Sequence, residues 1–179
     1  MERKQITRFV LTALFAALIS AGAFIKIPLV PAPVTLQTLF ALLAATILPP
    51  TMALLSVIAY LLLGVLGLPI FTTGGGLAAM LGPTGGFLIG MIPGVLAGSL
   101  IMKAMENRVR LASIISAIAT TALIYLVGLP WMSVQLNLSF TATLAAGLLP
   151  FLVGDTLKII VTVIVTPQVR ARVKELLEK

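Results

Sequence analysis

The sequence contains no cysteine and no histidine, and only 9% of its 179 residues are charged. The lack of cysteine excludes a disulfide scaffold, a cysteine nucleophile and thiolate metal sites. The lack of histidine argues against metal binding and against histidine-based acid–base catalysis. Soluble domains carry roughly 25% charged residues, so a chain this poor in charge is expected to have lipid as its solvent.

Basic residues outnumber acidic ones by 12 to 5, and ten of the 12 lie in three clusters at the ends of apolar segments. The clusters are Arg3, Lys4 and Arg8; Lys103, Arg108 and Arg110; and Arg170, Arg172, Lys174 and Lys179. Such clusters mark the cytoplasmic side of a membrane protein. The charge therefore predicts cytoplasmic amino and carboxyl termini and does not indicate a nucleic-acid partner.

Apolar residues make up 60% of the chain, and about 20 consecutive ones are needed for one helical crossing of a bilayer. The sequence predicts an all-α integral membrane protein, a multi-pass bundle of six helices forming one domain over residues 1–179. The expected spans are residues 9–25, 35–48, 51–66, 87–102, 111–130 and 148–165. The second is too short to cross unaided, so it is expected to begin below the outer surface, with Gln37 inside the protein.

Three irregular segments are expected on the outer face. Residues 26–35 contain three prolines and predict a stiff, extended loop. Residues 67–86 are rich in glycine, which permits irregular backbone, but no Lys-Ser/Thr follows as a phosphate loop requires. Residues 131–138 are expected to form a more polar loop. Without a nucleotide motif, the chain itself is not expected to use ATP.

Small residues recur at four-residue spacing in two of the spans. The rows are Ala13, Ala17 and Ala21, and Gly86, Gly90, Gly94 and Gly98. Such rows let another helix approach closely. The alanine row is expected either to pack inside the bundle or to dock a partner subunit. The glycine row is expected to receive a neighbouring helix or, at its outer end, a ligand.

An acid and a base, Asp155 and Lys158, interrupt the last apolar span. Their spacing places them on one helical face, and charges in hydrocarbon usually face a bundle interior or a water-filled cavity. The pair is open to three interpretations: a structural ion pair, a proton relay, or donors and acceptors for a ligand. A fitting ligand is small and largely apolar, with a few amide-like groups. Its candidate apolar walls are Phe71, Phe87 and Trp131, each of which has core packing as the alternative.

Four segments resemble the BioY family, the biotin-binding S components of energy-coupling factor (ECF) transporters. They are residues 33–39 (PVTLQTL), 64–71 (GVLGLPIF), 81–90 (LGPTGGFLIG) and 149–158 (LPFLVGDTLK). The resemblance implies a six-helix S-component fold in a prokaryotic plasma membrane, with an outward-facing biotin pocket. The implied partners are a transmembrane coupling subunit, which would dock on the row containing Ala13, Ala17 and Ala21, and two ATPase subunits.

The resemblance also implies a set of ligand-binding residues and no cofactor beyond the ligand. The predicted substrate-binding residues are Thr35, Gln37, Gly85, Gly86, Phe87, Asp155 and Lys158. Asp155 is expected to accept from ureido N–H groups, and the two glycines to let the backbone close on the ligand. The family commonly has tyrosine at the position of Phe87 and a basic residue at that of Thr51. Alternatives are an S component for another vitamin, a solitary biotin transporter or a non-transporting scaffold. An enzyme would need a nucleophile or metal set near the pair, and none is visible.

Overall fold

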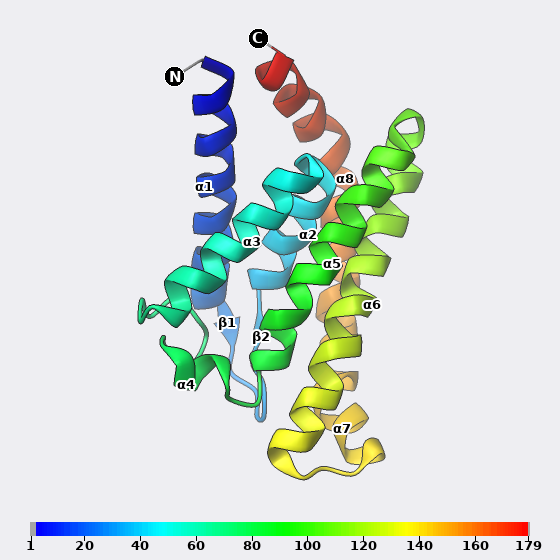
Figure 1. Ribbon diagram of the computed structural model, residues 1–179. Coiled ribbons are helices and arrows are strands. Elements are labelled where there is room, and N and C mark those ends of the chain that lie inside the picture. Colours follow the sequence, from blue (N-terminus) through cyan, green and yellow to red (C-terminus); the bar gives the residue numbers. More distant parts are fainter. Residues whose placement is uncertain (1–2, 179) are drawn as a thin grey trace.

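The computed structural model describes residues 3–178, which form an elongated, almost entirely helical bundle (Figure 1). Lys179, assigned above to the last basic cluster, lies outside the described residues. The helices are α1 (Arg3–Phe24), α2 (Gln37–Ile47), α3 (Pro50–Val65), α4 (Leu77–Met80), α5 (Gly85–Ala104), α6 (Val109–Leu136), α7 (Phe140–Gly147) and α8 (Leu152–Glu178). The remaining elements are the strands β1 (Lys26–Ile27) and β2 (Val34–Thr35) and the 3-10 turns η1 (Glu106–Arg108) and η2 (Leu149–Phe151). The predicted all-helical class is confirmed, apart from the two-residue strands.

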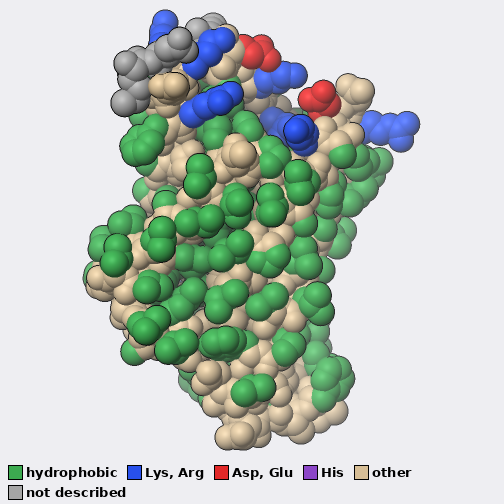
Figure 2. All heavy atoms as spheres, viewed as in Figure 1, with side chains coloured by type: hydrophobic (Ala, Val, Ile, Leu, Met, Phe, Trp, Pro, Cys, Tyr) green, Lys and Arg blue, Asp and Glu red, His purple; other side chains and the backbone are tan. Residues whose placement is uncertain are grey.

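Four helical segments of the described chain are long and apolar enough to cross a membrane. They are Arg3–Phe24, Gly85–Ala104, Glu106–Leu136 and Phe140–Glu178. The apolar helices α2 and α3 are shorter, with 11 and 16 residues. Figure 2 shows apolar side chains over the body of the molecule and a cap of charged side chains at the end where both termini lie. This distribution suits a bundle surrounded by lipid.

Helices α5 and α6 pack against each other along most of their length. A Cβ added at Gly90 would lie 2.9 Å from the carbonyl oxygen of Ile124, and one at Gly94 would lie 2.9 Å from that of Thr120. Thr120 Oγ1 also donates a hydrogen bond of 3.0 Å to the carbonyl of Gly94. The glycine row therefore receives a neighbouring helix, as one of the two predictions stated.

A line of buried polar groups joins α8 to α2. Lys158, Thr162, Thr166 and Arg170 follow one another at four-residue spacing on α8, and the two threonines are fully buried. Thr166 Oγ1 donates to Thr46 Oγ1 over 2.8 Å, and Arg170 Nη1 donates to the carbonyl of Thr46 over 2.8 Å. These bonds fix the register of α8 against α2.

The irregular segments meet at the end of the bundle opposite the termini (Figure 1). Strands β1 and β2 pair antiparallel, with Lys26 opposite Thr35, so the proline-rich segment forms a hairpin. Lys26 Nζ donates a hydrogen bond of 2.8 Å to the carbonyl of Thr72, in the glycine-rich segment. The prediction that these two loops share one face is confirmed.

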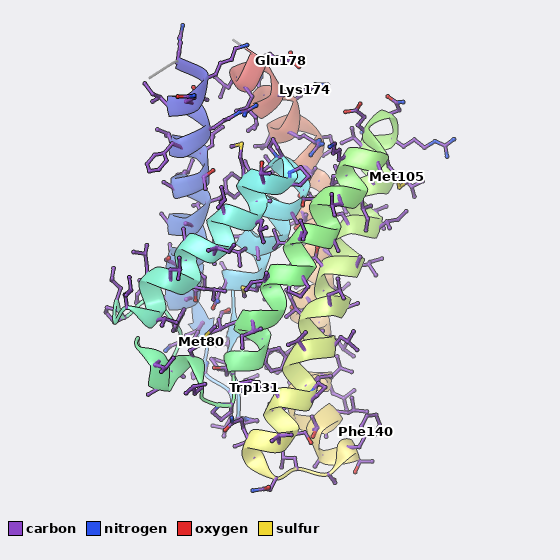
Figure 3. The ribbon with its side chains drawn as sticks, viewed as in Figure 1. Met80, Met105, Trp131, Phe140, Lys174 and Glu178 are labelled. Carbon is purple, nitrogen blue, oxygen red and sulfur yellow. The ribbon has the colours of Figure 1, made fainter. Side chains whose placement is uncertain are left out.

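The prediction of a polar loop after Pro130 is wrong, because α6 continues through Pro130 to Leu136. Trp131 packs against the start of α5, and its indole nitrogen donates a hydrogen bond of 2.9 Å to the carbonyl of Gly82 (Figure 3). This anchoring holds the extra turns in place. Asn137, which directly follows the helix, has a left-handed φ of 51° and caps its end.

Helix α8 likewise continues beyond the predicted span, through Pro167 to Glu178. Val173 is buried and Leu177 packs against the core, so the basic end of the chain belongs to the bundle and is not a separate tail.

Candidate functional site

A cavity opens among the hairpin, the first turn of α2, the first turns of α5 and α8 and the middle of α6. Its lining residues are Ala32, Pro33, Thr35, Gln37, Thr38, Thr72, Thr84, Phe87, Leu88, Met91, Thr121, Ile124, Tyr125, Phe151, Asp155 and Lys158. Apolar atoms form most of the wall, and polar side chains, among them Asp155 and Lys158, form the rest. A mostly apolar cavity with a few convergent polar groups is the usual form of a small-molecule site.

Asp155 and Lys158 form an ion pair in this wall. Lys158 Nζ lies 2.8 Å from Asp155 Oδ1, and the exposed fractions of the two residues are 6% and 9%. One turn of α8 separates them, so both side chains project from the same face of the helix. The pair keeps the wall electrically neutral, which lowers the free-energy cost of placing charges in an apolar bundle.

Two further side chains complete the hydrogen bonding of the pair. The phenol of Tyr125 donates to Asp155 Oδ2, and Lys158 Nζ donates to Thr38 Oγ1 over 2.7 Å. A carboxylate offers about four acceptor sites and an ammonium three donors. Asp155 and Lys158 therefore retain hydrogen-bonding capacity for a ligand while remaining held by the protein.

Gln37, the first residue of α2, supplies an amide at the inner part of the cavity. Its Nε2 donates to the phenol oxygen of Tyr60 over 2.8 Å and lies 3.8 Å from Met91 Sδ. Its backbone N–H donates to Thr35 Oγ1 over 3.3 Å. Tyr60 is fully buried and packs edge-on against Phe71, with 5.4 Å between ring centroids. The amide of Gln37 is thus oriented by the core beneath it.

Phe87 lines the cavity, and its ring packs edge-on against that of Tyr125 with 5.9 Å between centroids. Gly128 makes room for it, since a Cβ there would lie 2.3 Å from the Phe87 ring. Of the other predicted apolar walls, Phe71 lies in the core under Gly64, and Trp131 packs against α5.

Gly85 and Gly86, which are also predicted to bind the ligand, are not among the residues that line the cavity. A Cβ on Gly85 would lie 1.7 Å from the carbonyl oxygen of Met80, and one on Gly86 would lie 2.2 Å from Trp131 Cβ. Both glycines allow close packing of the backbone with neighbouring segments. The cavity thus brings together five of the predicted residues, which are Thr35, Gln37, Phe87, Asp155 and Lys158.

Tyr125 and Thr38 contact the ion pair directly but are not among the predicted site residues. Tyr125 is one of only two tyrosines in the chain and lies in an apolar segment. A buried phenol usually has a polar hydrogen-bond partner, so a tyrosine in an apolar segment is itself a sequence signal for a buried polar contact. Thr38 directly follows Gln37, but nothing in its sequence context points to Lys158.

The alanine row lies on the outside of α1. Ala13, Ala17 and Ala21 are exposed, whereas the buried face of this helix carries Ala16 and Ile19. Packing within this bundle therefore does not account for the row. A smooth, exposed strip of small side chains is suited to close contact with a helix of another chain.

Known proteins resemble this chain over nearly its whole length. A "Probable biotin transporter BioY" from Pyrococcus horikoshii is 36% identical over 172 residues, covering 95% of this chain and 98% of that protein. The "Biotin transporter BioY" of Thermotoga maritima is 35% identical over 153 residues, covering 85% of this chain and 89% of that protein. These relatives are named as transporters, not enzymes.

A solved structure shares the fold. The crystal structure of the S component for biotin from an ECF-type ABC transporter aligns with a TM-score of 0.86 at 28% identity, covering 96% of this chain and 94% of that one. The model of the BioY family matches residues 1–175. With this match over almost the entire sequence, the chain belongs to the BioY family.

Proposed function

We propose that this chain is the membrane-embedded, biotin-binding subunit of an uptake transporter in a prokaryotic plasma membrane. Helices α1, α3, α5, α6 and α8 cross the membrane, and α2 begins below the outer surface and makes the sixth crossing together with the β1–β2 hairpin. Both termini lie in the cytoplasm, and the cavity opens to the outside. The observation that carries the proposal is the buried Asp155–Lys158 pair in the wall of an apolar cavity, in a chain whose relatives are named biotin transporters.

The chemistry of the cavity suits biotin, which combines a ureido ring, an apolar body and a carboxylate. Asp155 accepts hydrogen bonds from ureido N–H groups, and Lys158 donates to a ligand oxygen. Thr35 and Gln37 add further polar groups, and Phe87 packs against the apolar part. Gly85 and Gly86 act indirectly, by holding the start of α5 against Trp131 so that Phe87 faces the cavity.

Delivery of biotin into the cell requires partner subunits, because this chain has no nucleotide-binding motif with which to use ATP. It uses no cofactor. A transmembrane coupling subunit docks on the exposed row of Ala13, Ala17 and Ala21, and two ATPase subunits drive transport through it. Two observations support this: the row lies on the side of α1 that points away from the bundle, and the fold is shared with an S component.

Purification in mild detergent from cells grown with biotin tests the binding function. We expect an equimolar amount of biotin to accompany the protein. Protein prepared from biotin-depleted cells should bind added biotin, and Asp155→Asn should weaken this binding by about one to two decades, because hydrogen bonds to charged groups contribute about 1.5–3 kcal/mol each. Recovery of another vitamin instead would assign the chain to a different substrate, and uptake in cells lacking the coupling module would make it a solitary transporter.

A further inference from the structure

A second cavity, of about 700 Å³, lies at the charged end of the bundle, and it shares no lining residue with the first. The lining comes from α1, from the turn between α2 and α3, from α5 with η1, and from α8. Because a water molecule occupies about 30 Å³ in the liquid, this space is large enough for a polyatomic ligand. Lys174 and Glu178, which Figure 3 shows at the end of α8, are among its lining residues.

The charge around this cavity is positive. Its basic side chains are Arg8, Lys103, Arg170 and Lys174, and its acidic ones are Glu106 and Glu178. Within residues 3–178 the ion pairs are Asp155–Lys158 and Arg172–Glu175, so none of the four cations around the cavity lies within salt-bridge distance of a carboxylate. An anion bound here would meet cations contributed by three separate helices.

Arg170 is a fixed cation at the inner wall. Its Nη1 donates to the carbonyl of Thr46 over 2.8 Å, and its Nη2 lies 3.5 Å from the carbonyl oxygen of Met102. These carbonyls lie in the last turns of α2 and α5, where helix dipoles place partial negative charge. Arg170 therefore has a defined position before any ligand binds, which lowers the entropy cost of binding.

The remainder of the lining is apolar. It consists of Ile47, Pro49, Pro50, Leu54, Leu96, Leu100, Val173 and Leu177, with Thr51 at the helical turn. Leu100 is 48% exposed on the outer surface of the bundle. A soluble anion such as phosphate would use the cations and leave the apolar wall in contact with water. A molecule with an anionic head and a hydrocarbon tail would satisfy both parts.

We propose that this second cavity binds the headgroup of an anionic phospholipid, with one acyl chain against the wall that contains Leu54, Leu96 and Leu100. Lys103 and Lys174 contact the phosphate, and Arg170 forms the inner end of the site. Basic pockets between membrane helices are known to bind anionic headgroups, with about 1 kcal/mol contributed by each Lys or Arg near an anionic surface. The proposal does not depend on which vitamin occupies the first cavity.

Native mass spectrometry of the detergent-solubilised chain tests this site. Phosphatidylglycerol or phosphatidylcholine is added in matched amounts, and the retained lipid is counted. The test variant is Lys103→Gln with Lys174→Gln. The control is Arg108→Gln with Arg110→Gln, which removes the same charge from exposed positions at the same end but outside the cavity.

We expect the native chain and the control to retain phosphatidylglycerol in preference to phosphatidylcholine, and the test variant to bind it about tenfold or more weakly. Millimolar inorganic phosphate should compete poorly, and equal melting temperatures of the two variants would show that both are folded. Equal loss of lipid in the test and control variants would overturn the proposal. Displacement of phosphatidylglycerol by inorganic phosphate would also overturn it, because the site would then bind a soluble anion and not a lipid. Unchanged lipid retention combined with loss of a co-purifying subunit in the test variant would make the cavity a protein-docking site and would also overturn the proposal.

Discussion

The phenol of Tyr125 on α6 donates a hydrogen bond to Oδ2 of Asp155 on α8, while Lys158 occupies Oδ1 of the same carboxylate at 2.8 Å. Both oxygens of Asp155 are thus held by side chains from two helices. The orientation of the carboxylate is fixed without a ligand, and a ligand that uses it does not have to order it. This arrangement makes the contribution of Tyr125 measurable separately from those of the two charges.

Replacing Tyr125 with phenylalanine removes this donor and keeps the edge-on packing of the ring against Phe87. We expect biotin affinity to fall about tenfold or more, since a hydrogen bond to a charged group contributes about 1.5–3 kcal/mol. Isothermal titration of the purified protein measures this. The control is Thr156→Val, because Thr156 is exposed on α8 and its hydroxyl donates only to the carbonyl of Leu152. Affinity equal to that of the control would show that Tyr125 does not orient Asp155 for the ligand.

Replacing Lys158 with methionine leaves the buried carboxylate of Asp155 without a counter-ion. Breaking a buried ion pair on one side costs about 3–5 kcal/mol, whereas replacing both partners is often neutral. We therefore expect Lys158→Met to lower the melting temperature in detergent more than the double variant Asp155→Asn with Lys158→Met does. If the double variant were the less stable of the two, the ion pair would stabilise the fold by itself. Stability would then be a sufficient reason for its presence, without a role in ligand binding.

Gly86→Ala should weaken the packing of α5 on α6. The new Cβ would lie 2.2 Å from Trp131 Cβ and 3.0 Å from the carbonyl oxygen of Val127, so the helices must move apart. Overpacking of this kind costs about 1–3 kcal/mol, visible as a lower melting temperature. Gly82→Ala is the matched control, because its Cβ would find nothing closer than 3.4 Å. Equal melting temperatures for the two variants would contradict the close packing at Gly86.

Ala13→Trp combined with Ala17→Trp should block the proposed docking face of α1. Two indoles on a strip of exposed small side chains prevent another helix from approaching. Biotin binding should be unchanged, while uptake and co-purification with the coupling subunit should be lost. Ala122→Trp, at an exposed position on α6, should affect none of these measurements. Persistence of uptake and co-purification in the double variant would remove docking from the role of this row.

Patterns with a simple physical cause were readable from the sequence. The positions of the helices could be predicted from the apolar segments, because segment length and the flanking prolines, glycines and charges are local signals. The row from Gly86 to Gly98 predicted a close helix contact because four-residue spacing places these glycines on one face. Asp155 and Lys158 were found because charges in an apolar segment are costly and therefore conspicuous.

Features that depend on contacts between distant segments were not readable. Pro130 looked like the end of a helix, but Trp131 docks on Gly82 and the helix continues. Gly85 and Gly86 are predicted to let the backbone close on a ligand, and the sequence does not show that their missing side chains also make room for Met80 and Trp131. Thr38 and Tyr125 contact the ion pair from two other helices, and their positions in the sequence do not predict these contacts.

The length of α2 has a consequence for the ligand. At 1.5 Å per residue, its 11 residues reach about 16 Å, whereas the 20 residues of α5 beside it reach about 30 Å. The missing half of this helix is replaced by the thin β1–β2 hairpin, and the first cavity occupies the room that remains. A ligand in the cavity would therefore stand in for a truncated helix and complete the interior of the bundle. The residue at which α2 begins sets how deeply a ligand can sink, so lengthening α2 by one turn would raise the floor of the cavity by about 5 Å.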